Sequence, residues 1–251
     1  MLPVNGFKRA LREGRQQIGI WNTVGGQVVA EALATAGYDW ILLDTEHSQT
    51  DVPDLLGMLQ AVAPWPVSAV VRPAANDTVL IKRILDFGAQ TLLIPYVQTV
   101  EEAEAAVAAM RYAPRGVRGV SYLTRATLYG TIPDYAARAE EELCLIVQAE
   151  TLATVERIGE IAAVDGVDAI FIGPADLAAS MGLPGQAGHP EVKAMVERAI
   201  LAIRTAGKPA GILTGDPAFA QRCIALGTTF TAVGIDLGLM LDAARARRAL
   251  F

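Results

Sequence analysis

The sequence has few side chains that could carry thiol or imidazole chemistry. Its 251 residues include two cysteines, Cys144 and Cys223, and two histidines, His47 and His189. Both cysteines stand in apolar runs, which argues against a disulfide framework or a thiolate metal cluster. No apolar run reaches membrane-spanning length, and the start, Met1–Gly6, lacks the basic and apolar segments of a secretory leader. We therefore expect a cytoplasmic protein in which histidine-based acid–base chemistry is confined to two positions.

Charge is also scarce, and it has the wrong sign for binding polyanions. Charged residues make up 19% of the chain, the net charge is -6, and hydrophobic residues make up 52%. The mean hydropathy is +0.34 and the isoelectric point is near 5.0. A chain of this kind can bury a large core, whereas nucleic acids and acidic membranes require a clustered basic surface. Small-molecule chemistry is the favoured function, with neither nucleic acid nor membrane as a partner.

Short β-branched or apolar runs alternate along the chain with longer alanine-rich segments of helical spacing. The predicted strands are Gln17–Trp21, Trp40–Asp44, Val67–Arg72, Thr91–Pro95, Leu143–Ala149, Ala169–Ile172, Pro209–Leu213 and Phe230–Gly234. Predicted helices include Pro53–Ala63, Val79–Phe87, Val100–Met110, Leu152–Ala163 and Glu191–Ala206. Eight strand–helix units are typical of an α/β fold of the TIM (β/α)8 class, and no Gly-x-Gly-x-x-Gly turn supports a Rossmann sheet. No linker divides the chain, so residues 1–251 are expected to form a single barrel domain; the least regular stretch, 112–134, is expected to be an inserted functional loop.

Polar residues end several of the predicted strands. In a barrel such residues meet at one mouth, because the carboxyl ends of parallel strands lie on the same side. The relevant segments are Asp44–His47, Arg72, Gln148–Glu150 and Gly173–Asp176. We expect these four strand ends to converge on one site.

Glu150 and Asp176 are candidate metal ligands from neighbouring strands. Two carboxylates without a nearby thiolate favour Mg²⁺ or Mn²⁺ over zinc. Either residue alone is better explained as the cap of the helix that follows, but the pair favours a metal site.

Arg72 and His47 are the remaining candidates for chemistry at the mouth. A guanidinium there could hold a carboxylate or stabilise oxyanion charge, or simply form an ion pair at the rim. His47 follows two acids that could orient it as a base, although a rim histidine without a role is the alternative. His189 precedes a proline-initiated helix, which favours a structural role.

The chain resembles the HpcH/HpaI family of metal-dependent, class II pyruvate aldolases, particularly its 4-hydroxy-2-oxoheptanedioate aldolase branch. The segments that carry the resemblance are Gly37–Trp40, Asp44–His47, Val71–Pro73, Leu85–Gly88, Val147–Thr151, Phe171–Leu177 and Ala232–Asp236. The resemblance implies a carbon–carbon lyase that reversibly cleaves a 4-hydroxy-2-keto acid to pyruvate, or hydroxypyruvate, and an aldehyde through an enolate stabilised by a divalent metal.

The resemblance also implies a role for each matching residue. His47 becomes the catalytic base and Arg72 the stabiliser of enolate charge, with Asp86 raising the basicity of His47 and Asp44 as its second candidate partner. Glu150 and Asp176 become ligands of a divalent metal such as Mg²⁺, Mn²⁺ or Co²⁺. The expected contacts to the keto acid are Gln148, Gly173, Ala175, Asp176 and Leu213. The role of Asp86 rests on the resemblance alone.

Departures from the heptanedioate branch affect the expected substrate and leave alternatives. Thr45, Ser48, the Trp21–Gly26 turn and the Ser121–Arg125 loop differ from that branch, so a sugar-acid aldolase or a hydroxypyruvate-using relative fits equally. The family resemblance further implies a homohexamer built from two trimers that exchange the last helix, here the apolar helix from Leu237. An acyl-CoA lyase of the citrate lyase β-chain type is the enzymatic alternative, and a non-catalytic keto-acid-binding barrel is the other.

Overall fold

Eight parallel strands close into a barrel in the computed structural model, which describes residues 1–251. The strands are β1 Gln17–Asn22, β2 Trp40–Asp44, β3 Ser68–Arg72, β4 Thr91–Ile94, β5 Cys144–Ala149, β6 Ala169–Ile172, β7 Ala210–Leu213 and β8 Thr228–Ile235. Each strand pairs with its neighbour in the sequence, and β8 returns to pair with β1. The expected (β/α)8 barrel is confirmed, and every predicted strand is present, with ends that differ from the prediction by at most two residues.

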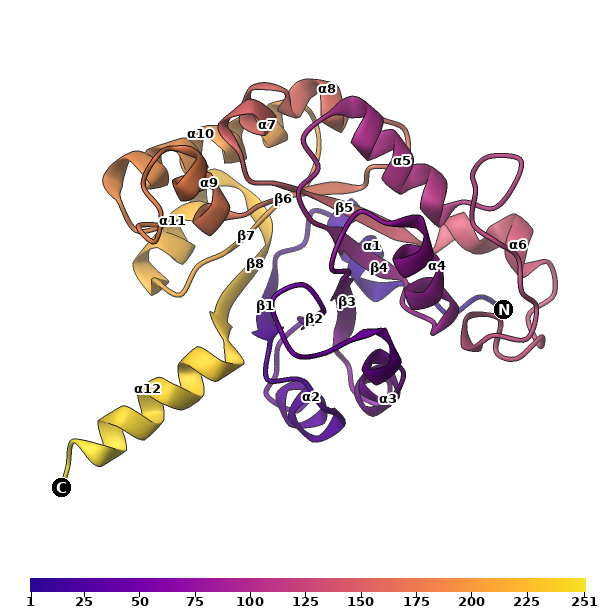
Figure 1. Ribbon diagram of the computed structural model, residues 1–251, viewed down its shortest axis with the longest axis horizontal. Coiled ribbons are helices and arrows are strands. Elements are labelled where there is room, and N and C mark those ends of the chain that lie inside the picture. Colours follow the sequence, from indigo (N-terminus) through magenta and orange to yellow (C-terminus); the bar gives the residue numbers. More distant parts are fainter.

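Helices surround the barrel (Figure 1). They are α1 Gly6–Arg12, α2 Gln27–Ala34, α3 Val52–Val62, α4 Thr78–Asp86, α5 Val100–Met110, α6 Tyr135–Arg138, α7 Leu152–Glu156, α8 Ile158–Ala162, α9 Pro174–Ser180, α10 Pro190–Thr205, α11 Pro217–Leu226 and α12 Asp236–Arg248. The helix expected over 152–163 is two short helices that meet at Arg157. Local sequence determines several helix starts: Asp51 and Thr99 each form a capping box at the beginning of α3 and α5.

The core has two layers, as the closed sheet requires. One cluster of buried side chains fills the barrel interior, and a larger cluster lies between strands and helices. Inside the barrel, glycine makes room for large rings: a Cβ on Gly19 would lie 2.1 Å from Trp40 Cε2, and one on Gly211 would lie 2.1 Å from Phe230 Cε2. The interior is therefore closely packed around aromatic side chains rather than open.

The two ends of the barrel differ. Helix α1 packs across the amino-terminal end, where the Phe7 ring lies 5.8 Å from the Trp40 ring and 5.5 Å from the Phe230 ring. The carboxyl-terminal end stays open, which leaves the polar strand ends accessible. Helix α12 extends from β8 away from the rest of the molecule (Figure 1). None of the helices is long and apolar enough to cross a membrane.

Candidate active site

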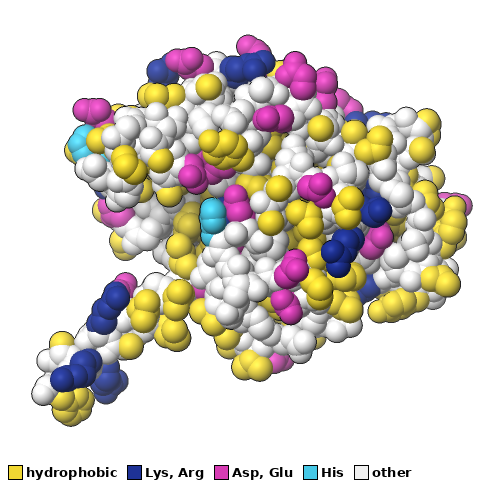
Figure 2. All heavy atoms as spheres, viewed as in Figure 1, with side chains coloured by type: hydrophobic (Ala, Val, Ile, Leu, Met, Phe, Trp, Pro, Cys, Tyr) yellow, Lys and Arg dark blue, Asp and Glu magenta, His cyan; other side chains and the backbone are white.

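A cavity of about 850 Å³ opens at the carboxyl ends of the strands. Among the residues that line it are Asp44, His47, Arg72, Gln148, Gly173, Ala175, Asp176 and Leu213. In the space-filling view a histidine and acidic side chains meet near the centre of the face shown (Figure 2). The strand ends singled out from the sequence therefore do converge on one mouth.

Asp44 and Arg72 form a buried ion pair at the ends of β2 and β3. Arg72 Nε donates to Asp44 Oδ1 at 2.9 Å and Nη2 donates to Oδ2 at 2.6 Å. Trp21 also donates its indole N–H to Asp44, at 3.2 Å, and its ring centroid lies 5.1 Å from the guanidinium carbon. Burial opposes ionisation of Asp44, but the hydrogen bonds and charge of Arg72 outweigh it and lower the pKa of that carboxyl. Asp44 therefore holds Arg72 in one orientation.

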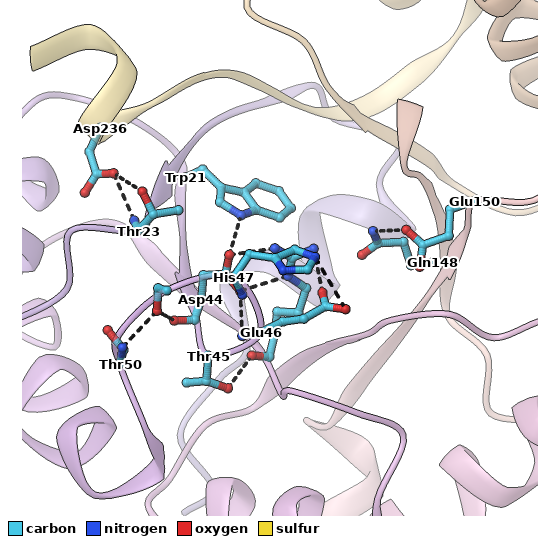
Figure 3. Close-up of polar contacts among 12 residues, drawn as sticks. Trp21, Thr23, Asp44, Thr45, Glu46, His47, Thr50, Gln148, Glu150 and Asp236 are labelled. Carbon is cyan, nitrogen blue, oxygen red and sulfur yellow. Dashed lines mark hydrogen bonds and ion pairs between the residues drawn. The ribbon is translucent and has the colours of Figure 1, made fainter. Parts of the chain in front are cut away.

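Glu46 connects this ion pair to His47 (Figure 3). Its Oε2 atom lies 2.8 Å from Arg72 Nη1, and its Oε1 atom lies 3.8 Å from His47 Nε2. Burial raises the pKa of Glu46 despite the opposing charge of Arg72. The His47 side chain is 67% exposed, so its imidazole can meet a substrate at the mouth. Asp44 reaches the backbone N–H of His47, at 3.5 Å, and not its ring.

Glu150 is buried at the end of β5 and is held by a strained backbone turn. Its Oε1 atom accepts from the backbone N–H of Tyr96 at 2.7 Å, and Tyr96 has φ 54, a left-handed conformation uncommon for a residue with a side chain. Its Oε2 atom accepts from Gln148 Nε2 at 2.6 Å. A Cβ on Gly173 would lie 2.6 Å from that Oε2 atom, so only glycine fits beside it. Burial raises the pKa of Glu150 to about 7, with Asp176 and Glu46 adding to the rise.

The oxygen atoms around Glu150 fit a hard divalent cation. Gln148 Oε1 is buried without a hydrogen-bond partner, and Asp176 in the first turn of α9 raises the pKa of Glu150 through its charge. A cation would satisfy the orphaned amide oxygen and neutralise the two carboxylates. No group of three or more His, Cys, Asp or Glu side chains is arranged to hold a metal. The protein can thus offer two carboxylates, with further ligand positions left for water and substrate.

Asp86 is the predicted residue that lies outside this group. It ends α4, and its Oδ1 atom accepts from Arg118 Nη2 at 2.8 Å. Arg118 in turn stacks on the Tyr112 ring, with the guanidinium carbon 4.5 Å from the ring centroid. The carboxylate that approaches the His47 ring in this chain is Glu46, so the role of Asp86 stays a prediction.

The strand-end argument missed three residues that shape the site. Trp21 is not a polar residue at a strand end, although its indole donates to Asp44. Glu46 was named only as part of the Asp44–His47 segment, and it pairs with Arg72. Tyr96 contributes through its backbone N–H. The signal for Glu46 was present in the sequence, because two acids precede His47. No sequence signal indicates the left-handed backbone of Tyr96.

The barrel and its mouth define a class of protein before any comparison is made. The mouth carries an exposed imidazole, a guanidinium fixed by an ion pair, and two carboxylates, all at the carboxyl ends of the strands. These groups are typical of a (β/α)8 enzyme that acts on a small anionic substrate.

Comparison with known proteins agrees and is more specific. A family model described as HpcH/HpaI aldolase/citrate lyase matches residues 17–243. The chain is 61% identical to a pyruvate aldolase of Rhizobium etli, over 100% of this chain and 98% of the relative. It is 56% identical to a hydroxypyruvate/pyruvate aldolase of Sagittula stellata, over 99% and 98%. A crystal structure of an HpcH/HpaI aldolase/citrate lyase family protein from Burkholderia cenocepacia superimposes with a TM-score of 0.94 at 38% identity, covering 98% of both chains.

This chain belongs to the HpcH/HpaI aldolase/citrate lyase family, as its motifs predicted. It is a carbon–carbon lyase of the aldolase class, which confirms the expected enzyme type.

Proposed function

We propose that this protein reversibly cleaves 4-hydroxy-2-keto acids to pyruvate, or hydroxypyruvate, and an aldehyde, with a divalent metal at Glu150 and Asp176. The observation that carries the proposal is the meeting of four groups in one cavity: the exposed His47 imidazole, the oriented Arg72 guanidinium, and an oxygen-rich corner formed by Gln148 and Asp176 beside Glu150. The names of the two relatives described above support the same reaction.

Arg72 can stabilise negative charge even though Asp44 and Glu46 already hold it. Its Nε and Nη2 each donate one hydrogen bond to Asp44, and its Nη1 lies 2.8 Å from Glu46 Oε2 as an ion pair. A guanidinium has a second hydrogen on each terminal nitrogen, so donors remain for a substrate oxygen. Because their direction is fixed before the substrate arrives, they need no reorganisation when charge develops on the keto oxygen of the enolate.

His47 is placed to move the proton in either direction. In cleavage its imidazole accepts the proton of the 4-hydroxyl group, the bond between C3 and C4 breaks, and the aldehyde leaves. In synthesis it removes a methyl proton from pyruvate, and the resulting carbanion equivalent attacks the aldehyde carbon. A divalent cation, when bound, acts as a Lewis acid toward the keto acid. Glu46 Oε1 lies 3.8 Å from His47 Nε2, so this carboxyl group faces the imidazole that moves the proton.

Metal dependence and the His47 role are tested together in cleavage assays. Retro-aldol turnover should vanish with a chelator and return with Mn²⁺, Co²⁺ or Mg²⁺, and His47→Gln should remove it in every metal. His189→Asn is the matched control, because His189 caps α10 through its ring nitrogen, 3.3 Å from the Glu191 N–H. Turnover that survives the chelator would contradict the metal mechanism.

The donor and acceptor remain to be assigned within this reaction. We propose that the protein accepts both pyruvate and hydroxypyruvate as donors, on the strength of the Rhizobium etli and Sagittula stellata relatives. Those relatives also favour an aldolase over an acyl-CoA lyase. A panel of pyruvate and hydroxypyruvate against short hydroxyaldehydes tests this assignment, and activity restricted to a CoA thioester would reject it.

We further propose that the protein is a homohexamer, a dimer of trimers, in which α12 packs on a second copy. Leu239 and Met240 are 49% and 54% exposed on this 13-residue helix, and hydrophobic side chains mark its start (Figure 2). A lone helix of this length is marginal in water, so it needs a packing partner. Light scattering should give the hexamer mass for the wild type and a smaller mass for Met240→Lys; a monomer in both would reject the exchange. Two buried free thiols, Cys144 and Cys223, support a cytoplasmic location.

A further inference from the structure

Asp236 begins α12 and binds the segment that follows β1. Its Oδ2 atom accepts from Asn22 Nδ2 at 2.7 Å, and its Oδ1 atom accepts from the backbone N–H and the hydroxyl of Thr23, both at 2.9 Å. The N–H of Val24 donates to Oδ2 at 3.1 Å. Figure 3 shows Asp236 aimed at Thr23 from the start of the helix. One carboxylate thus joins two parts of the chain that are more than two hundred residues apart.

Asp236 is buried, with 7% of the residue exposed. Its partners are N–H and O–H groups of residues 22–24 together with the N–H of Leu237 in its own helix, at 2.8 Å. A buried carboxylate is costly unless such donors surround it. The donors come from residues 22–24 only when that segment lies against the first turn of α12, so the carboxylate selects this arrangement.

The two joined segments form one wall of the mouth cavity. Thr23 and Val24 line it from one segment, and Leu237 and Gly238 line it from the first turn of α12. The charged groups assigned to the keto acid, Arg72 and Asp176 among them, belong to other strand ends of the same cavity. The cavity, at about 850 Å³, is much larger than a three-carbon keto acid needs. The wall formed by residues 22–24 and the first turn of α12 is therefore available to the rest of the substrate.

We propose that Asp236 is a positioning residue that sets the aldehyde-side wall of the site by fixing residues 22–24 to the start of α12. The proposal rests on the aldolase function proposed above. Asp236 touches no reacting atom; it acts through the position of Thr23, Val24 and the first turn of the helix. It follows that Asp236 governs how tightly the aldehyde is held and which chain lengths fit, and leaves deprotonation of the keto acid alone.

Asp236→Asn is the sharpest perturbation, because it keeps the shape and changes the donor pattern. In the wild-type protein both carboxylate oxygens of Asp236 accept hydrogen bonds, whereas the asparagine amide has one acceptor oxygen and one donor nitrogen. The nitrogen would face N–H groups on one side, so either the Thr23 contacts or the Asn22 and Val24 contacts are lost. Thr23→Val is a milder second variant, which removes the hydroxyl contact and keeps the backbone contact.

The full-length, metal-loaded protein would be assayed in two separate steps. Exchange of pyruvate methyl protons in deuterated water reports the keto-acid step, and aldol addition with aldehydes of increasing length reports the second. Asp242→Asn is the control: it removes a carboxylate from the same helix, but Asp242 is 78% exposed and lies 3.6 Å from Arg245 only. Thermal unfolding and light scattering confirm that each variant folds and assembles.

Asp236→Asn should raise the KM for the aldehyde about tenfold and flatten the preference among chain lengths. Thr23→Val should shift the aldehyde KM and the chain-length preference in the same direction by a smaller factor. In both variants the rate of pyruvate proton exchange should stay within about twofold of the wild type. Unchanged aldehyde KM and selectivity in both variants, with or without a lower melting temperature, would show that Asp236 only stabilises the helix start and would overturn the proposal. If the metal-loaded wild-type protein does not exchange the methyl protons of pyruvate, the aldolase function itself is refuted.

Discussion

Replacing Asp44 by asparagine tests whether the buried ion pair both stabilises the barrel and orients Arg72. The Asp44 side chain is 0% exposed and that of Arg72 is 8% exposed. Removing one partner of such a pair leaves a buried charge unpaired, at a cost of about 3–5 kcal/mol. Arg72 keeps Glu46 at 2.8 Å, so we expect the low end, a loss of about 3 kcal/mol in the free energy of unfolding.

The effect on turnover should be larger than a stability loss alone explains. The asparagine nitrogen would face Arg72 N–H groups now held at 2.9 and 2.6 Å, so the guanidinium must turn. Misplacing one donor to a developing oxyanion lowers kcat about 100-fold or more. Urea unfolding at fixed protein concentration measures the stability, and cleavage kinetics measure the turnover. A stability loss below about 1 kcal/mol together with wild-type kcat would refute the role given to this pair.

The same variant has a predicted pH signature. Because the pKa of Asp44 is lowered in the folded protein, its contribution to stability is fully present above the unfolded pKa of about 3.9 and is lost as the pH falls through the lower folded value. The wild-type advantage over Asp44→Asn should therefore hold at neutral pH and disappear in acid. The exposed Asp242→Asn serves again as the charge-matched control, and an advantage that grows on acidification would contradict the assignment.

Three further predictions concern the metal corner, the thiols and the barrel interior. Gly173→Ala places a Cβ 2.6 Å from Glu150 Oε2, so calorimetry should show Mn²⁺ affinity falling about tenfold or more; unchanged affinity would remove Glu150 as a ligand. Burial raises the pKa of the Cys223 thiol to about 11, which leaves roughly one molecule in a thousand as thiolate at pH 8. Mass spectrometry should therefore find Cys223 unlabelled by iodoacetamide in the folded protein. Rapid labelling of Cys223 would contradict its burial. Gly19→Ala would place a Cβ 2.1 Å from the Trp40 ring and should lower the free energy of unfolding by about 3 kcal/mol. Its control, Gly188→Ala, places a Cβ with no atom within 4 Å and should change that free energy by less than about 0.5 kcal/mol. Equal changes in the free energy of unfolding of the two variants would be inconsistent with the packing described.

Much of the fold and part of the site could be predicted because they follow from local pattern. Strand periodicity located all eight strands, and barrel geometry then required Arg72, Gln148 and Asp176 to meet at one end. Helix ends were less predictable, as at Arg157, where one expected helix is two.

The residues that sequence reasoning missed depend on contacts between distant segments or on unusual backbone. Asp236 was quoted as part of a motif, but its function depends on Asn22 and Thr23, which only the closure of β8 onto β1 brings near. The Tyr96 N–H reaches Glu150 because of a left-handed turn that no residue preference indicates. Family resemblance alone assigned Asp86 to His47, and within this chain its carboxylate binds Arg118.

The most direct test of the central claim is proton exchange from pyruvate, since it isolates the step for which this mouth is arranged. The methyl protons should exchange in deuterated water only when both the protein and a divalent metal are present, and His47→Gln should slow the exchange about 100-fold or more, with His189→Asn unchanged. Exchange that persists in His47→Gln, or that ignores a chelator, would contradict the account of a metal-assisted base at the mouth of the barrel.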